Sequence, residues 1–475
     1  MEKKFKNIIR NNINLTYTEP VIIAFSGGID SICLLNLFSK TTNPIIVAHF
    51  NHGIRENADR DEEFSRNFAQ QFNYEFVSAK EDVGTFASKN HLSIEEAARQ
   101  KRYEFLFRIA RKKGADKIAV GHQADDQVET VMMHFLRGSG LSGLSGMKEE
   151  AIIPEFDPKI SIIRPLLSFW REEIKNYCDH NHLEYVVDET NLNDIYERNR
   201  IRLKILPFLN NLYPGLNSRI FNMANIIQND DELIQKQIQI SWDSCCILEN
   251  HQFIQFEKLE FQKLSISIQR RIIRKAVDKI NPEIRDLSYQ NVENLLQFLN
   301  QNKPGEIDLQ QNVIAVIGNN TLTLGSRFKE WIDIIYPQLN DTIKFDIKWD
   351  KLIRISSNWI FQINNWINTE SIPMNKDNKY IVFLDADSFG NENIILRSRK
   401  DGDRFQPLGM DKGSIKISDF FINEKLEKSA RNKWPLLVNS SEEIIWIPGF
   451  KPGNKFRIKK STSRVIQFSI SKTDD

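Results

Sequence analysis

Glycines, hydroxyl groups and one carboxylate lie together in the stretch Ser-Gly-Gly-Ile-Asp-Ser, residues 26–31. The two glycines let the backbone approach a ligand closely and adopt φ values that other residues disfavour. The serine hydroxyls can donate hydrogen bonds to phosphate oxygens, whereas a carboxylate alone would repel them. The carboxylate of Asp30 therefore predicts a divalent cation, Mg²⁺, between itself and the phosphates. The predicted phosphate-binding residues are Ser26, Gly27, Gly28, Ile29, Asp30 and Ser31.

A second group of titratable side chains lies in the stretch His-Gln-Ala-Asp-Asp-Gln-Val-Glu, residues 122–129. On a helix, Asp126 and Glu129 are i,i+3 neighbours, so their carboxylates can face one site. The alternative is a solvated acidic helix start, which the helix dipole favours. His122 directly follows a strand-like run, and both a catalytic and a structural role stay open for it.

Two pairs of arginines have the spacing of helix neighbours. Arg99 and Arg102 are three residues apart, and Arg198 and Arg202 are four apart, so each pair shares one helix face. One guanidinium from each pair could stabilise the charge that develops on a phosphate during its transfer. Arg102 and Arg202 are the predicted members, and surface ion pairs with neighbouring glutamates are the alternative.

The elements that must position these residues alternate between strand and helix over the first 210 residues. This alternation predicts a mostly parallel sheet with helices on both faces. Such a sheet binds ligands at the carboxyl ends of its strands. Residues 26–31 follow the first strand and start a helix, whose N-terminal N–H groups attract anions. The alternative for these residues is a glycine turn with a serine helix cap. Strands are predicted at residues 20–25, 44–50, 74–80 and 116–122.

Helical spacing dominates from residue 211 to about residue 302, and strand-like runs return after it. A helix from residue 94 has clear boundaries, because Ser93 and Glu96 form a capping-box pattern and Gly114 ends the periodic run. The predicted parts are an α/β domain over 1–210, a mainly helical domain over 211–330, a connector over 331–385 and an α+β domain over 386–475.

The strand–SGGIDS–helix unit resembles the PP-loop of the N-type ATP pyrophosphatases, and four more N-terminal stretches narrow the match. They are FNHGIRENADRDEEF, IEEAARQKRYEFL, GHQADDQVETVMMHFLRGSGLSGLSGM, and RPLL followed by DETNLNDIYERNRIR. With the late segment RSRKDGDRFQPLGMDKGSIKISDFFINEKLEKSARNKWPLL, these stretches resemble the tRNA(Ile)-lysidine synthetase family at both ends of the chain.

The resemblance implies a catalytic Rossmann-like α/β domain of the adenine nucleotide alpha hydrolase type over 1–210. It further implies that the helical domain over 211–330 and the α+β C-terminal domain over 386–475 bind tRNA. It also implies a reaction: ATP adenylates the position-2 oxygen of the wobble cytidine in tRNA(Ile) with a CAU anticodon, releasing pyrophosphate. Free L-lysine then displaces AMP to form lysidine. As the resemblance suggests, Asp126 and Glu129 hold the lysine ammonium, Asp30 binds Mg²⁺, and Arg102, Arg202 and His122 lie at the reacting groups.

Rival functions are another PP-loop tRNA-modifying ligase or thiolase, or a non-catalytic RNA-binding protein. The four cysteines include no C-x-x-C pair, which argues against an iron–sulfur thiolase. Amidotransferase relatives often begin with a cysteine nucleophile, and here Glu2 follows Met1.

The 64 basic and 63 acidic residues nearly cancel, so any surface that binds RNA must be a local patch of basic side chains. The run from Lys451 to Arg464 contains six basic residues and no acidic one, and a predicted helix carries Arg270, Arg271, Arg274 and Lys275. No stretch approaches the ~18 apolar residues of a membrane span, and we expect a cytoplasmic protein. A homodimer would suit an L-shaped RNA.

Overall fold

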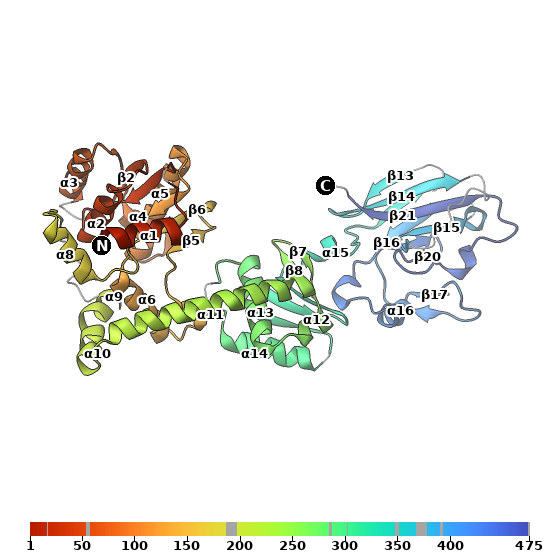
Figure 1. Cartoon of the computed structure of the whole chain (residues 1–475). Coiled ribbons are helices and arrows are strands. Elements are labelled where there is room, and N and C mark those ends of the chain that lie inside the picture. The colour runs from red at the N-terminus through yellow and green to blue at the C-terminus, as the bar shows by residue number, and fades with distance from the viewer. Residues whose placement is uncertain are drawn as a thin grey trace. The chain divides into compact units, whose positions relative to one another are not determined.

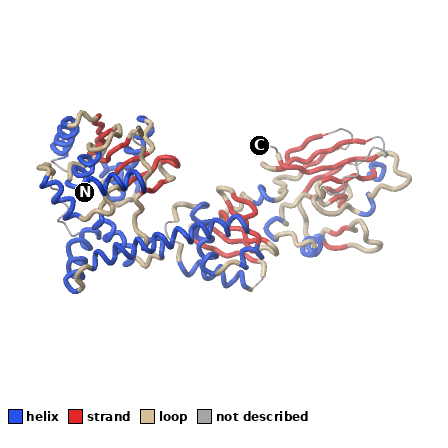
Figure 2. Tube along the Cα trace, viewed as in Figure 1, coloured by secondary structure: helices blue, strands red, loops and turns tan. Residues whose placement is uncertain are grey.

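The computed structural model describes the chain apart from residues 17, 54–57, 187–196, 285–286, 302, 347–350, 367–377, 390–392 and 474–475. The chain divides into two compact units, Met1–Gln235 and Lys236–Asp475. Figure 1 labels the elements, and Figure 2 shows that strands and helices occur in both units.

A six-stranded sheet forms the centre of the first unit, in the order β3-β2-β1-β4-β6-β5. The first five of these strands pair in parallel, and only β5 runs antiparallel to its neighbour. The four strands predicted from the sequence are confirmed, whereas the β5–β6 hairpin was not predicted. The strands are β1 Val21–Ala24, β2 Ile45–Asn51, β3 Glu75–Lys80, β4 Lys117–Ala119, β5 Glu150–Ile153 and β6 Asp157–Ile163.

Helices cover both faces of this sheet. In β1, Val21 and Ile23 pack into one core with α2 (Ile29–Phe38), while Ile22 packs into a second core with α5 (Ile94–Lys113). Strands that are buried on both faces need continuous apolar runs, and β1 and β2 have them. The remaining helices of this region are α1 Glu2–Asn7, α3 Ala58–Gln71, α4 Val83–Asn90, α6 Ala124–Leu136, α7 Leu141–Leu144 and α8 Arg171–His180.

The predicted capping box at the start of α5 is confirmed. The Ser93 side chain accepts a hydrogen bond from the Glu96 N–H, the Glu96 carboxylate accepts one from the Ser93 N–H, and Gly114 ends the helix at a φ of +65°. We expect Ser93→Ala to lower the free energy of unfolding by about 1 kcal/mol. Urea denaturation of the two proteins measures this difference, and an unchanged midpoint would contradict it.

The basic segment after residue 196 was predicted as one helix, but its helix type changes along the chain. It runs through α9 (Glu197–Arg200), a π-helical turn (Ile201–Ile205) and α10 (Leu206–Leu212) before α11 (Leu216–Cys245). Ile201 and Leu206 pack with Val128 and Val131 of α6. These apolar contacts hold the arginines of the segment against the acidic side of α6.

In the second unit, helices α12 (Lys258–Lys263), α13 (Ile266–Ile280) and α14 (Tyr289–Asn300) accompany an antiparallel sheet in the order β7-β8-β11-β10-β9. The strand-like runs of β10 and β11 were predicted, but β7 and β8 were not. Cys246 directly follows helix α11 and starts β7. The strands are β7 Cys246–Glu249, β8 Phe253–Glu257, β9 Gly305–Gln310, β10 Val313–Ile317 and β11 Thr321–Ser326.

Two four-stranded antiparallel sheets follow, β12-β16-β19-β20 and β13-β14-β21-β15. Their apolar side chains share one core, in which Leu396 and Trp446 meet Phe361 and Phe468. Residues 331–385, predicted as a connector, supply the four strands β12 to β15 to these sheets. The bounds are β12 Ile343–Asp346, β13 Lys351–Arg354, β14 Trp359–Trp366, β15 Ile381–Asp385, β16 Asn393–Arg397, β19 Leu436–Asn439, β20 Ile444–Trp446 and β21 Val465–Lys472.

Three smaller elements complete the second unit, α15 (Ile332–Ile335), the two-stranded β17–β18 ladder (Arg404–Phe405 with Ile415–Lys416) and α16 (Ile417–Asn423). The predicted fold class is confirmed: a parallel α/β domain, a helical region and a C-terminal part with antiparallel sheets. In the part of the chain that the structure describes, no helix is long and apolar enough to cross a membrane.

Candidate active site

The predicted phosphate-binding loop connects β1 to α2 at the carboxyl edge of the sheet. Gly27 has a φ of +79°, which favours glycine, and Gly28 caps α2 in an extended conformation. The Ser31 hydroxyl donates to the Gly28 carbonyl oxygen at 2.8 Å, and the hydroxyls of Ser26 and Ser31 lie 3.3 Å apart. These contacts hold the loop open around the N-terminus of α2, where an anion is favoured.

Asp30 lies in the first turn of α2 and forms no ion pair within the described residues. Its Oδ1 is buried and accepts no hydrogen bond from the described residues. Burial, together with the nearby carboxylate of Asp126, raises the pKa of Asp30 from 3.8 to about 7 despite the opposing charges of Arg171 and Arg202. A buried carboxylate with a raised pKa and a free oxygen is suited to bind a cation.

The end of β4 packs directly against this loop. A Cβ on Gly121 would lie 3.2 Å from the carbonyl carbon of Asp30, so only glycine fits there without a shift. The next residue, His122, is half-buried, and burial together with Arg164, Arg102 and Arg198 lowers its pKa well below the ordinary value. His122 is therefore a neutral imidazole at neutral pH.

Asp126 and Glu129 face one site, as their spacing predicted, and both bind arginines from the segment after residue 196. Asp126 Oδ1 lies 2.9 Å from Arg198 Nη2 and 3.1 Å from Arg202 Nη2. Glu129 Oε2 accepts from Arg198 Nε at 2.8 Å and from Arg202 Nη2 at 2.9 Å. The two carboxylates and two guanidiniums form a closed, charge-balanced group, which we call the arginine–carboxylate cluster.

Arg202, which was predicted to stabilise a phosphate, lies in this cluster, and so does Arg198, which was not chosen. The alternative was a surface ion pair with Glu197, but in the structure Glu197 pairs with Arg137. The predicted phosphate role of Arg202 stays a prediction. Asp125 is turned away, and its Oδ2 accepts from the Arg171 N–H at the start of α8 at 3.0 Å. The spacing of Arg198 and Arg202 was the signal that could have identified both.

Arg102 is not part of the arginine–carboxylate cluster. Its guanidinium lies 5.5 Å from the centre of the Tyr103 ring, and it is close enough to His122 to lower the pKa of that side chain. Among the described residues it forms no ion pair. The prediction that Arg102 and Arg202 together stabilise the charge on one phosphate stays a prediction.

Gln127 is a residue whose role the sequence did not reveal. Its side chain accepts from the Met147 N–H at 2.7 Å and donates to the Met147 carbonyl oxygen at 3.0 Å. A Cβ on Gly146 would lie only 2.7 Å from the Gln127 amide group. The glycine-rich segment before Met147 is thus tied to α6 next to the cluster, and α7 lies within it.

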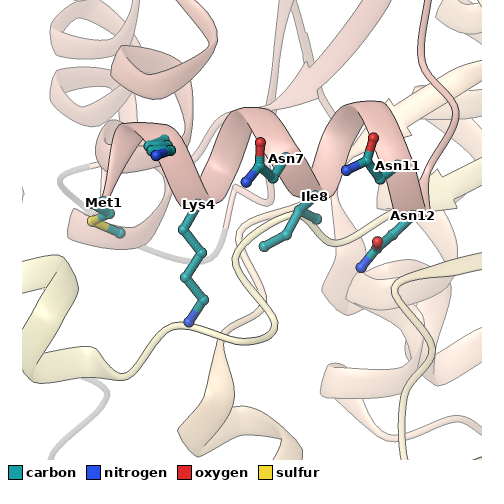
Figure 3. A pocket seen from close by; sticks show the side chains of 7 residues that line it. Met1, Lys4, Asn7, Ile8, Asn11 and Asn12 are labelled. Atoms are coloured by element: carbon teal, nitrogen blue, oxygen red, sulfur yellow. The ribbon is translucent and has the colours of Figure 1, made fainter.

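The structure also has a surface hollow along residues 1–12. Figure 3 shows Lys4 extending from helix α1, together with asparagine side chains, and the Lys4 ammonium donates to the Ser168 carbonyl oxygen at 2.7 Å. No predicted site residue lines this hollow, so it is not the candidate active site. Its lining residues are Met1, Lys3, Lys4, Asn7, Ile8, Asn11 and Asn12.

The two basic surfaces predicted to bind RNA differ in how far their side chains are engaged within the protein. On α13, Arg270 pairs with Glu293 at 2.6 Å and Lys275 donates to Gln239 at 2.7 Å, so these charges are engaged within the protein. In the run from Lys451 to Arg464, by contrast, Lys459 and Lys460 are exposed and have no ion pair within the described residues. In the C-terminal run, therefore, at least these two ammonium groups carry charge that no carboxylate of the described residues balances.

Comparisons with known proteins agree with this geometry. A PP-loop domain model matches residues 1–209, and a model described as the TilS substrate C-terminal domain matches residues 394–468. The tRNA(Ile)-lysidine synthase of Clostridium tetani is 33% identical over 465 residues, covering 95% of this chain and 94% of that protein. The corresponding enzyme of Clostridium perfringens strain 13 is 32% identical, with 99% of both chains covered.

Among solved structures, a TilS C-terminal domain is matched along its whole length, with 28% of this chain covered, at 19% identity and a TM-score of 0.25. The family models cover both ends of the chain, and the full-length relatives cover the region between them. The chain belongs to the tRNA(Ile)-lysidine synthase family.

Proposed function

We propose that this enzyme joins L-lysine to carbon 2 of the wobble cytidine in tRNA(Ile) with a CAU anticodon, using ATP and Mg²⁺. Family membership makes the chain a PP-loop ligase that uses ATP and acts on tRNA. The observation that carries the finer proposal is the closeness of Asp30 to the arginine–carboxylate cluster, since Asp126 and Arg202 both shift the pKa of Asp30. A nucleotide site and an ammonium site thereby lie side by side.

In the first step, the position-2 oxygen of the cytidine attacks the α-phosphorus of ATP, and pyrophosphate leaves. The loop of residues 26–31 holds the departing phosphates with backbone N–H groups and hydroxyls. Arg202 and Arg102 are proposed to stabilise the charge on the α-phosphate. His122, being neutral, can donate or accept one hydrogen bond there without adding charge.

In the second step, the lysine side-chain amine attacks carbon 2, and AMP leaves with the former position-2 oxygen. A lysine ammonium has an unperturbed pKa near 10.4, so it must lose a proton before it attacks. Asp126 and Glu129 are proposed to hold the ammonium and relay that proton. Because both carboxylates bind Arg198 and Arg202 here, the incoming ammonium must take over part of these contacts.

Mg²⁺ fits the residues around Asp30. The described residues contain no cluster of three or more histidine, cysteine, aspartate or glutamate side chains that could hold a metal. Mg²⁺ is nevertheless commonly bound by one or two carboxylates plus substrate phosphates. The buried Oδ1 of Asp30 supplies one such carboxylate oxygen, and the cation would neutralise charge on the phosphates beside it.

The direct test combines purified protein, ATP, Mg²⁺, labelled lysine and tRNA(Ile) with a CAU anticodon. Label in the tRNA supports the proposal, whereas pyrophosphate release without incorporation of lysine indicates another PP-loop ligase. Binding of tRNA without any pyrophosphate release indicates a non-catalytic RNA-binding protein. Because the substrate is a tRNA, we also propose a cytoplasmic location and, as an arrangement that suits an L-shaped RNA, a homodimer, which light scattering can test.

We propose that residues 211–330 and 386–475 bind the body of the tRNA, with the C-terminal basic run as the main contact. Replacing Arg457, Lys459 and Lys460 together by glutamine should weaken tRNA binding by about tenfold and leave ATP binding unchanged, because each removes one phosphate contact.

Filter binding at fixed salt measures this loss. Replacing Arg111, Lys113 and Lys117, which pair with carboxylates and lie outside both proposed tRNA-binding parts, is the matched control and should change little. Equal tRNA affinity of the two triple variants would refute the placement of the RNA surface. Charge substitutions are preferable to a truncation near residue 390, because β14 and β15 pair with the C-terminal strand β21.

A further inference from the structure

Several arginines, three of which form no ion pair within the described residues, gather beside the carboxyl ends of β4 and β6. Arg99 and Arg102 come from α5, and Arg164 directly follows β6. Together with Arg198, all of them are close enough to His122, after β4, to lower the pKa of that imidazole. Arg198 pairs with the carboxylates of Asp126 and Glu129. For the other three guanidiniums, no carboxylate partner is present among the described residues.

Arg164 is the most informative member, because it is buried. The residue is 6% exposed, its Nη1 donates to the Lys148 carbonyl oxygen at 2.8 Å, and its guanidinium also interacts with the Tyr103 hydroxyl. Its Nε is buried and has no partner among the described residues. Burial and the charge of Arg99 lower the pKa of Arg164, and no carboxylate is among the groups that shift it. A buried guanidinium without a counter-ion is costly, so an anion is the partner that this site lacks.

Arg99 and Arg102 lie on the exposed side of the same group. Their guanidinium carbons are 5.1 and 5.5 Å from the centre of the buried Tyr103 ring, which orients both side chains. Neither forms an ion pair within the described part of the chain. The Tyr103 hydroxyl lies beside Arg164 and adds a further polar group. The group is therefore buried at Arg164 and open to solvent at Arg99, which is exposed.

The anion differs from the phosphates held by residues 26–31. That loop follows β1, whereas Arg164 follows β6, and β4 lies between the two strands. Two strand spacings amount to roughly 10 Å. The β- and γ-phosphates that leave as pyrophosphate from the first loop do not reach this distance while they stay bound there. The α-phosphate is already assigned to Arg102 and Arg202, so Arg99 and Arg164 are left for a second anion.

We propose that Arg99 and Arg164 form a subsite for a backbone phosphate of the RNA substrate, adjacent to the cytidine that reacts. The proposal rests on the proposed function and adds a positioning contact to it. A planar guanidinium binds phosphate oxygens through two parallel N–H donors. Contacts to phosphates fix the register of a nucleic acid on a protein without reading its sequence. Arg99 and Arg164 thereby set which nucleotide of the anticodon loop enters the site between Asp30 and the arginine–carboxylate cluster.

The test measures binding of a tRNA(Ile) transcript with a CAU anticodon over a series of KCl concentrations. Arg99→Gln should weaken binding about tenfold at low salt and reduce the slope of log K against log salt by about one. Arg164→Lys, which keeps the charge but loses the planar fork, should weaken binding in the same direction. Arg108→Gln is the matched control, because Arg108 is an exposed arginine of the same helix that is not among the arginines acting on His122 or Arg164.

A second measurement locates the phosphate. Anticodon stem-loop RNAs with one neutral methylphosphonate, placed either 5′ or 3′ of the cytidine, should bind the wild-type protein more weakly at one of the two positions. The Arg99→Gln protein should be insensitive to that replacement. If Arg99→Gln and Arg108→Gln bind tRNA equally, or if Arg99→Gln loses ATP affinity with unchanged tRNA affinity, the RNA subsite is wrong. If the wild-type protein binds no tRNA, the proposed function itself fails.

Discussion

Replacing Asp30 by alanine should reduce pyrophosphate release by about 10³-fold while the protein stays folded. The carboxylate is the one group of the loop that can bind Mg²⁺, and without the cation the phosphates at the N-terminus of α2 would not be held for departure. Release of pyrophosphate from ATP in the presence of tRNA is the measurement. Wild-type turnover in this variant would remove the proposed Mg²⁺ role.

The stability of an Asp30→Asn variant gives an independent check without turnover. A carboxyl whose pKa rises from 3.8 to about 7 on folding binds its proton more tightly in the folded state, so it destabilises the fold as pH rises through that range. At pH 8 the effect amounts to about 4 kcal/mol. Asp30→Asn should therefore melt at a higher temperature than wild type at pH 8, and the difference should shrink as pH falls toward 5.

Mg²⁺ should oppose this difference in melting temperature between wild type and Asp30→Asn. Adding Mg²⁺ with a non-hydrolysable ATP analogue supplies the missing counter-charge to Asp30 and should raise the melting temperature of wild type more than that of Asp30→Asn. Asp59→Asn is a control, since Asp59 is an exposed carboxylate paired with Lys80, outside the nucleotide site. Equal gains for all three proteins would show that the cation does not contact Asp30.

The PP-loop was predictable because all its determinants are local. An apolar strand, two glycines, two serines and a helix start follow one another within about fifteen residues, and the capping box of α5 needs only Ser93 and Glu96. Each of these features depends on backbone geometry that neighbouring residues fix. The alternation of strands and helices likewise indicated the parallel sheet.

The partners of Asp126 and Glu129 could not be read from the sequence. Arg198 and Arg202 are about 70 residues away, and they reach α6 only because Ile201 and Leu206 pack on its apolar side. Strand β8 was missed for a related reason. Its run of Phe253 to Phe256 is short and buried throughout, so it has no alternation that distinguishes a strand from part of a helix.

Replacing Glu129 by glutamine should abolish transfer of lysine, with a loss of at least about 10²-fold, while pyrophosphate release persists. Glu129 is 1% exposed and binds two guanidiniums, so its loss removes the buried charge that an ammonium would use. Incorporation of labelled lysine and release of pyrophosphate, measured in the same reaction, separate the two steps. A parallel fall in both would mean that Glu129 supports the whole site rather than the amine.

Because breaking a buried ion pair can destabilise a protein by about 3–5 kcal/mol, folding must be controlled. Asp126→Asn changes the less buried carboxylate, which leaves Glu129 to hold both arginines, and it should raise the KM for lysine more than it lowers the rate of pyrophosphate release. Glu197→Gln, which removes the exposed partner of Arg137, should leave both steps intact. An unchanged KM for lysine in Asp126→Asn would mean that the carboxylates hold the arginines in place and that the amine binds elsewhere.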